Sequence, residues 1–174
     1  IPTEYVAEGF VLDLRSLLVS LRGRTTQEAG RLVLFDQDHT EMTYGAALKL
    51  LERFARVTIV TPRERVASDV ALLNRQSIYQ QLFDRRVEII CNVEPRSLDG
   101  LEDARMTLFN VYNGDSIELD EVAAVTFATP RVPDDQLRAA FEVAGREVHL
   151  VGDCYAPRSV LAATRQGYEV GLAV

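Results

Sequence analysis

The sequence predicts an α/β fold with three layers, built on a central, mostly parallel sheet that carries an antiparallel β-meander as an insertion. Residues 31–36 form a near-continuous apolar run that ends in an acid, and residues 56–62 form a β-branched run closed by a proline. Between them, apolar residues recur every three or four positions from Met42 to Phe54, which predicts a helix with one face packed on a sheet. Parallel strands joined by a crossover helix form a βαβ unit, and sheets of such units bind ligands beyond the carboxyl ends of their strands.

Further elements are predicted on both sides of this unit. Asp13 is placed to cap a helix whose leucines share one face and which ends near Gly23. After a charged loop, we expect a second helix over residues 74–85, with Phe83 facing inward, and a third parallel strand over residues 87–92.

The antiparallel insertion is predicted from a hairpin pattern. Residues 106–112 and 116–119 flank Asn113-Gly114, the pair that best accepts the two positive φ angles of a tight hairpin turn. The apolar run of residues 122–128 is then predicted to return to the parallel sheet as a buried strand.

The last part of the chain is predicted to hold two more helices and one strand. Prolines interrupt residues 129–133, and Asp134 or Asp135 is expected to cap the helix that follows. We expect an apolar strand over residues 148–152 and a final helix over residues 159–172.

Composition and charge narrow the function classes. The chain has 174 residues, and its 19 basic and 26 acidic side chains give a net charge of −7, which argues against nucleic acid and anionic membrane surfaces as partners. Cys91 and Cys154, without a secretory leader, suggest reduced thiols in a cytoplasmic protein. The apolar runs are only strand-length, so no membrane span is predicted. Because the chain begins at Ile1 rather than at Met, we expect a fragment of a longer protein.

Four segments share their order and spacing with a known family. They are Leu-Val-Leu-Phe-Asp at 32–36, Val-Thr-Ile-Val-Thr-Pro at 57–62, Thr-Pro-Arg-Val-Pro-Asp at 129–134 and His-Leu-Val-Gly-Asp-Cys-Tyr-Ala-Pro-Arg at 149–158. In this order, they resemble the C-terminal dinucleotide-binding region of the trimethylamine dehydrogenase and 2,4-dienoyl-CoA reductase branch of the old yellow enzyme family of NADH:flavin oxidoreductases. The resemblance covers nearly the whole chain from about Val11, and it implies a Rossmann-like fold of the FAD/NAD(P)-binding type.

The resemblance also implies a division of the chain. Residues 1–30 would be a lead-in segment and helix, residues 31–128 an NAD-type lobe, and residues 129–174 the closing strand and helix of an FAD-type lobe. Family members also hold FMN in a (β/α)8 barrel and carry a 4Fe-4S cluster. The barrel needs about 250 residues and the cluster about four cysteines, so both are expected only in the parent enzyme. The expected partners are that flavin barrel and the rest of the nucleotide lobe, and a second copy of the chain is a further candidate.

The first candidate site is the turn between the first parallel strand and its helix. A glycine-rich turn lets the backbone approach a pyrophosphate at the positive end of a helix. Here Asp36 opens the turn, only Gly45 is glycine, and Thr43 and Tyr44 replace a glycine pair that the resemblance leads us to expect. Either the turn keeps weak binding of ADP or NAD, or it closes a crossover and binds nothing.

The second candidate site follows the next strand. The resemblance to doubly wound folds places the adenosine ribose of a dinucleotide near Thr61, Pro62 and Arg63. Arg63 or Arg65 would suit a 2′-phosphate, which mildly favours NADP over NAD, although solvated loop arginines explain the same residues.

The third candidate site lies near the end of the chain. By resemblance, Gly152 and Asp153 meet the ribityl or diphosphate part of the FAD or ADP in the outer lobe, and Thr129 and Arg131 lie on the crossover near the nucleotides. The alternative for Asp153 is a helix N-terminal box, in which the carboxylate satisfies free backbone N–H groups.

No catalytic residue and no metal site is predicted. His39 is expected to be an exposed loop histidine, and Asp36, Asp38 and Glu41 lack the further ligands that a hard cation needs. Two functions therefore stay open. The chain is a nucleotide-binding module of a flavin-dependent oxidoreductase, not catalytic alone, or it is a degenerate lobe with a structural or subunit-interaction role.

Overall fold

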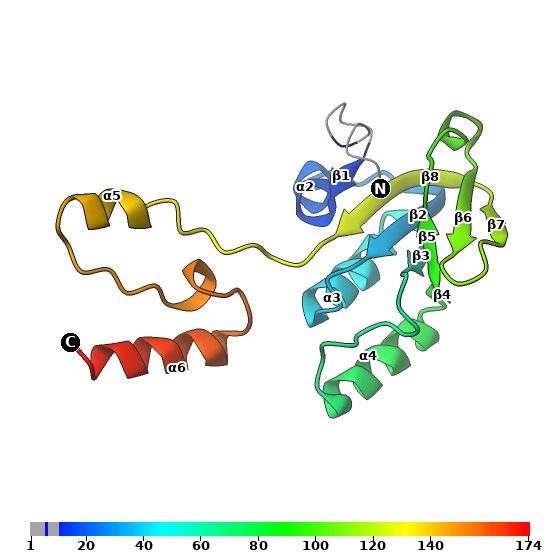
Figure 1. Ribbon diagram of the computed structural model, residues 1–174. Helices are drawn as coiled ribbons and strands as arrows, with labels where there is room; N and C mark the ends of the chain where they lie inside the picture. Colours follow the sequence, from blue (N-terminus) through cyan, green and yellow to red (C-terminus); the bar gives the residue numbers. More distant parts are fainter. Residues whose placement is uncertain (1–5, 7–10) are drawn as a thin grey trace. The chain divides into compact units, whose positions relative to one another are not determined.

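The computed structural model describes Val6 and residues 11–174, and it divides the chain into two compact units. Unit 1 runs to Thr129, and unit 2 runs from Pro130 to Val174 (Figure 1). The lead-in expected before residue 10 lies largely outside the described residues.

Unit 1 is built on a five-stranded parallel sheet with the strand order β1-β8-β2-β3-β4. Strand β2 lies at its centre, where Leu34 pairs with Ile59 of β3 on one side and with Thr126 of β8 on the other. The strands are β1 (Leu12–Asp13), β2 (Glu28–Asp36), β3 (Phe54–Val60), β4 (Glu88–Ile90) and β8 (Val122–Ala128).

The two faces of this sheet are covered differently. Three helices, α2 (Leu14–Ser20), α3 (Glu41–Leu50) and α4 (Leu72–Asp84), contribute to the core on one face. The other face packs against an antiparallel sheet of β5 (Val93–Pro95), β6 (Met106–Asn110) and β7 (Ser116–Leu119), with the short 3-10 helix η1 (Leu101–Asp103) between β5 and β6. The result is the expected three-layer fold with an antiparallel insertion (Figure 1).

Strand β2 shows why its sequence is almost entirely apolar. Leu32 and Leu34 point into the helix-side core, whereas Val33 and Phe35 point into the core beneath the antiparallel sheet. Successive side chains of a strand face opposite sides, so a strand covered on both faces needs apolar residues at every position.

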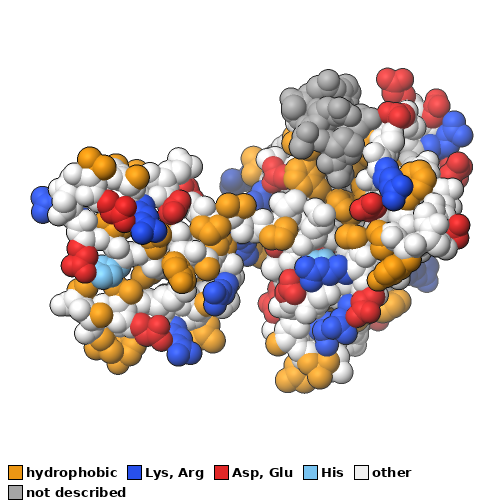
Figure 2. Space-filling view, viewed as in Figure 1, with side chains coloured by type: hydrophobic (Ala, Val, Ile, Leu, Met, Phe, Trp, Pro, Cys, Tyr) orange, Lys and Arg blue, Asp and Glu red, His pale blue; other side chains and the backbone are white. Residues whose placement is uncertain are grey.

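Unit 2 contains α5 (Arg138–Val143), the 3-10 helix η2 (Gly152–Cys154) and α6 (Val160–Gly171). Residues 130–174 are all described, and none of them is buried. Figure 2 shows hydrophobic side chains on the surface of this unit. Its exposed large apolar residues are Val132, Leu137, Phe141, Val143, Tyr155, Val160, Leu161, Tyr168, Leu172 and Val174.

Several sequence-based predictions are confirmed. The βαβ unit, the third parallel strand, the hairpin and the returning strand β8 are all present, and Asp13 caps α2 by accepting from the backbone N–H groups of Arg15 and Ser16. Ser159 caps α6 in the same way through the N–H of Ala162. The structure also adds β1 and β5, which the sequence did not reveal because each is only two or three residues long.

Three details in unit 1 were wrong. Helix α3 ends at Leu50, and Phe54 instead opens β3, where it reaches the same core. Phe83 is 66% exposed and stacks on the half-buried Tyr79 ring, whereas its neighbour Leu82 is fully buried. In the hairpin, five residues link the strands and only Gly114 has a positive φ (+76°), since Asn110 rather than a two-residue turn organises the loop.

Two details in unit 2 were also wrong. Residues 148–151 form no strand, because no strand within residues 130–174 lies beside them to share backbone hydrogen bonds. Neither Asp134 nor Asp135 caps α5 through its side chain, and Leu137 occupies the N-cap position. Asp135 only accepts a hydrogen bond from the Arg138 N–H through its backbone carbonyl.

Candidate functional site

The carboxyl end of β2 places Asp36 in a fully buried position at the start of the β2–α3 turn. One of its oxygens accepts from the backbone N–H groups of Asp38 and His39, at 3.1 and 2.9 Å. The other accepts from the Tyr44 hydroxyl at 2.6 Å. Three donors therefore compensate the desolvation of this carboxylate, as a buried acid requires.

Tyr44 joins this turn to residues 61–71, the segment that links β3 to α4 and that we call the β3–α4 segment. The Tyr44 ring lies in the helix-side core and its hydroxyl, besides donating to Asp36, accepts from the backbone N–H of Ala67. Burial, reinforced by the Asp36 carboxylate, raises the pKa of Tyr44 far above its usual value. The hydroxyl therefore keeps its proton and remains the donor to Asp36.

His39 is fully buried, so its expected exposure was wrong. It adopts a left-handed backbone conformation with a φ of +55°, which turns the ring inward. Its Nε2 lies 3.4 Å from the Thr61 hydroxyl, while its Nδ1 has no hydrogen-bond partner and lies 3.5 Å from the second Asp36 oxygen. Burial lowers the pKa of His39, although the Asp36 carboxylate opposes this effect.

Asp36, His39, Tyr44 and Thr61, here called the Asp36 cluster, thus form one closed polar group at the carboxyl ends of β2 and β3. Of the residues predicted to bind a nucleotide in unit 1, the structure brings together Asp36, Tyr44 and Thr61. Their polar atoms bond to one another and to nearby backbone rather than facing an open space.

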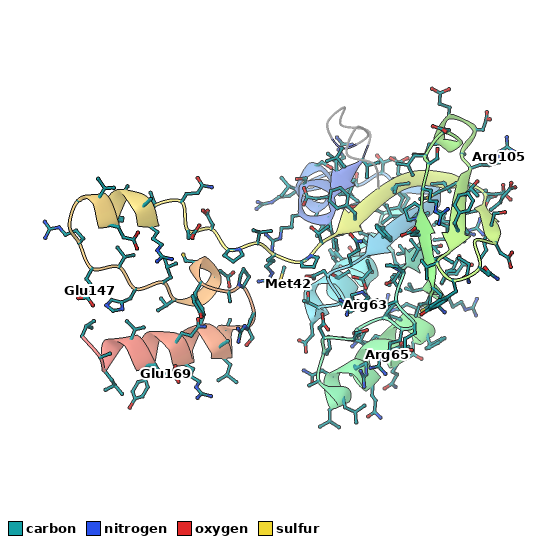
Figure 3. All side chains as sticks on the ribbon, viewed as in Figure 1. Met42, Arg63, Arg65, Arg105, Glu147 and Glu169 are labelled. Atoms are coloured by element: carbon teal, nitrogen blue, oxygen red, sulfur yellow. The ribbon has the colours of Figure 1, made fainter. Side chains whose placement is uncertain are left out.

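The other predicted residues of this end are arranged separately. Arg63 lies on the exposed part of the β3–α4 segment, where Figure 3 labels it together with Arg65, and it pairs with Asp69 at 3.5 Å. Pro62, between Thr61 and Arg63, is half-buried. Gly45 lies in the second turn of α3 and is exposed, with open space where a Cβ would stand, so no close backbone approach requires a glycine there.

The acidic residues of the turn also go to separate partners. Asp38 accepts from the hydroxyls of Thr40 and Thr43, and Glu41 accepts from the Asn74 side chain at 2.6 Å. Among the described residues, no group of three histidine, cysteine, aspartate or glutamate side chains is arranged to hold a metal ion.

In unit 2, the structure brings together Arg131 and Asp153, two of the predicted residues. The Arg131 guanidinium lies 3.7 Å from an Asp153 oxygen, and the Asp153 side chain remains mostly exposed. Gly152 has a φ of +63°, and its N–H donates to the Gln166 side chain of α6 at 2.8 Å. Since Ser159 caps α6 and no side chain caps η2, the alternative role of Asp153 as a helix N-terminal box is wrong.

Sequence reasoning missed one contact of the Asp36 cluster, the Ala67 N–H, and misassigned one member, His39. Ala67 contributes only a backbone N–H, for which no side-chain pattern exists. His39 could have been found from its position, because histidine is one of the few residues enriched at left-handed positions and it follows a buried acid by three residues.

Structures similar to this fold come from flavoprotein oxidoreductases. Histamine dehydrogenase from Rhizobium sp. 4-9 is 22% identical with a TM-score of 0.73, and 92% of this chain aligns with 25% of that one. The 6-hydroxypseudooxynicotine amine oxidase from Pseudomonas geniculata N1 is 20% identical with a TM-score of 0.76, covering 94% of this chain and 24% of that one. Thioredoxin reductase from T. acidophilum is 14% identical with a TM-score of 0.64, covering 98% and 58%.

These similarities confirm the sequence resemblance at the level of the fold. Histamine dehydrogenase and the amine oxidase are members of the trimethylamine dehydrogenase and old yellow enzyme family, and thioredoxin reductase has an FAD/NAD-binding fold. The chain spans about a quarter of the length of the first two proteins. No family model and no curated protein sequence matches the chain. Within the described part of the chain, no helix is long and apolar enough to cross a membrane.

Proposed function

We propose that this chain is the C-terminal nucleotide-binding module of a flavin-dependent NADH:flavin oxidoreductase resembling trimethylamine dehydrogenase, and that it is not catalytic alone. The observation that carries the proposal is the fold likeness to histamine dehydrogenase, which extends over 92% of the chain and so includes residues of both units. The redox chemistry would belong to FMN and an iron–sulfur cluster in the parent enzyme, and this module would hold a nucleotide and brace the assembly.

We place the nucleotide contacts of this module in unit 2. Asp153 presents a mostly exposed carboxylate beside Arg131, a pair that offers an acceptor for ribose hydroxyls and a cation for a diphosphate. Gly152 supports this role, because its left-handed backbone turns the chain tightly just before Asp153. Thr129 precedes this unit on the crossover, and FAD or ADP is the nucleotide that the resemblance favours here.

The partner that this proposal requires is the remainder of the outer nucleotide lobe. None of residues 130–174 is fully buried, so their exposed apolar residues would gain further stability if another surface covered them. The flavin barrel of the parent enzyme is the second expected partner.

The proposal is tested by a nucleotide titration and by cofactor analysis. ADP, FAD, NAD and NADP are titrated into the chain and into Asp153→Asn, with Asp134→Asn as the matched control from the same unit. A ligand at about 100 times its dissociation constant adds roughly 2.7 kcal/mol of stability. We expect ADP or FAD to raise the unfolding temperature of the wild-type chain and of Asp134→Asn, but not that of Asp153→Asn. We also expect the full-length protein to contain flavin and iron. A full-length protein without flavin and iron would overturn the proposal.

The Asp36 cluster favours a second candidate function. Apart from the unpartnered Nδ1 of His39, its polar atoms bond to one another or to nearby backbone where a doubly wound sheet would bind its ligand. Such an arrangement is expected of a lobe that has lost its ligand and serves in packing or subunit interaction. If no nucleotide raises the unfolding temperature of the chain, and the full-length protein does contain flavin and iron, this role would be favoured over nucleotide binding.

A further inference from the structure

The carboxyl end of the unit 1 sheet is the position at which doubly wound folds hold a dinucleotide. There the pyrophosphate lies between the end of a strand and the N-terminus of the following helix. In this chain the corresponding strand and helix are β2 and α3, and the β3–α4 segment follows the neighbouring strand at the same end of the sheet.

Tyr44 reaches this position with its hydroxyl from the first turn of α3, while its ring lies in the helix-side core. It is the largest fully buried side chain of the described residues, with 1% of its surface exposed. Its hydroxyl bridges the Asp36 carboxylate and the Ala67 N–H, so it connects the end of β2 with the β3–α4 segment. A phosphate at this place would have to displace both hydrogen bonds and approach the buried Asp36 carboxylate.

The β3–α4 segment is also held by contacts that Tyr44 does not make. Val66 and Ala67 are fully buried, Ala67 has a left-handed φ of +56°, and the Thr61 hydroxyl lies 3.4 Å from His39. The segment therefore closes over the turn, and Tyr44 supplies the bond to the buried N–H of Ala67 within it.

We propose that Tyr44 is the residue that closes the carboxyl-end crevice of unit 1 and keeps a dinucleotide out of it. This inference rests on the proposed function, since it directs the nucleotide of the module to the Gly152–Asp153 end alone. The closure combines the two hydrogen bonds of the hydroxyl with the burial of Val66 and Ala67 in the segment that the hydroxyl holds.

The first test compares two tyrosines that contact the same segment. Tyr44→Phe removes the hydroxyl that bonds to the Ala67 N–H and leaves the ring, and Tyr79→Phe removes a hydroxyl that lies 3.5 Å from the Val66 carbonyl. Loss of the partner of a buried N–H should speed hydrogen exchange at the Ala67 amide by about tenfold to a hundredfold. We expect this only in Tyr44→Phe. Equal exchange at Ala67 in wild type and Tyr44→Phe would overturn the closure.

The second test resolves binding by site. Millimolar NADH and ADP are added to the full chain while backbone amide shifts are recorded at residues 37–40, Ala67 and residues 152–154. In wild type, we expect neither ligand to change the amide chemical shifts of residues 37–40 and Ala67. In Tyr44→Ala, which removes the ring, we expect ligand-dependent changes at these amides. Shifts at these amides in wild type, or a folded Tyr44→Ala without them, would overturn the inference.

The same spectra separate this inference from the proposed function. If neither ligand moves residues 152–154 but Tyr44→Phe exposes Ala67 and Tyr44→Ala admits NADH, the nucleotide-binding role of unit 2 fails and the closure by Tyr44 stands. If Tyr44→Ala does not fold, the same ligand titration is recorded for Tyr44→Phe, which keeps the packing of the ring and removes only the hydroxyl bonds. Ligand-dependent shifts at residues 37–40 and Ala67 are then expected in Tyr44→Phe, and their absence would overturn the inference.

Discussion

The two units of this chain treat their polar and apolar groups in opposite ways. Unit 1 encloses two apolar cores and even buries the Asp36 cluster, whose members bond to one another. Unit 2 forms its helices and caps α6 with Ser159, yet none of residues 130–174 is buried. Local signals are thus enough to form helices, whereas a stable domain also needs enough chain to enclose a core. Unit 1 meets both conditions, and unit 2 meets only the first.

The largest expected difference between the units is the effect of removing a leucine side chain. Leu34 is fully buried in β2, so Leu34→Ala should lower the free energy of unfolding by about 2–5 kcal/mol through lost burial and the cavity left behind. Leu161 is 79% exposed in α6, and Leu161→Ala should change it by less than about 0.5 kcal/mol. Urea denaturation of both variants measures the difference, and similar losses would contradict the contrast.

Replacing one glycine in each unit by alanine should change the free energy of unfolding by a smaller amount, with opposite signs in the two units. Gly152→Ala should destabilise unit 2 by about 1–2 kcal/mol, because an L-residue is strained in the left-handed region, and its Cβ would lie 3.2 Å from that of Ala163. Gly45→Ala should stabilise unit 1 by about 0.5–1 kcal/mol, because α3 offers open space and alanine favours a helix. Helical circular dichroism and urea denaturation test the two variants. A destabilising Gly45→Ala would contradict the prediction, because it would mean that α3 requires a glycine at this position.

The smallest expected effect is a pH dependence specific to unit 1. Burial lowers the pKa of His39, nearby Arg63 adds to this, and Asp36, Asp69 and Asp38 oppose it. The unfolded chain therefore takes up this proton at a higher pH than the folded chain. The contribution of neutral His39 is complete above the unfolded pKa of about 6.5 and is lost as the pH falls toward the lower folded value.

The measurement is urea denaturation between pH 7.5 and pH 5. His39→Asn is the matched variant, because asparagine also tolerates a left-handed backbone and does not titrate. We expect wild type to lose more stability than His39→Asn over this range. Identical losses would mean that the histidine ring does not remain enclosed.

Most of the unit 1 fold could be predicted from its sequence because its signals are local. The apolar run of β2, the helical spacing of α3 and the β-branched run of β3 each identify their element without knowledge of its neighbours. The strand expected at residues 148–152 failed for the opposite reason, since a strand exists only where a neighbouring strand accepts its hydrogen bonds.

The candidate site was less predictable. The substitution at Tyr44 marked the turn as unusual, but its partner is the backbone N–H of Ala67, 23 residues away in sequence. His39 was misassigned because its burial depends on a backbone conformation that no pattern of apolar residues reveals. Asp153, in contrast, was predicted by resemblance alone and stays a prediction, and its exposure beside Arg131 followed only from the structure.

The contrast between the two units is tested most directly by residue-resolved native-state hydrogen exchange of the whole chain. We expect the amides of Leu32–Phe35 in β2 to exchange only through global unfolding, slowed by about ten-thousandfold or more, and those of residues 164–171 in α6 to be slowed by no more than about a hundredfold. Protection in α6 equal to that in β2 would contradict this picture, because it would mean that unit 2 is already stabilised without a surface to cover it.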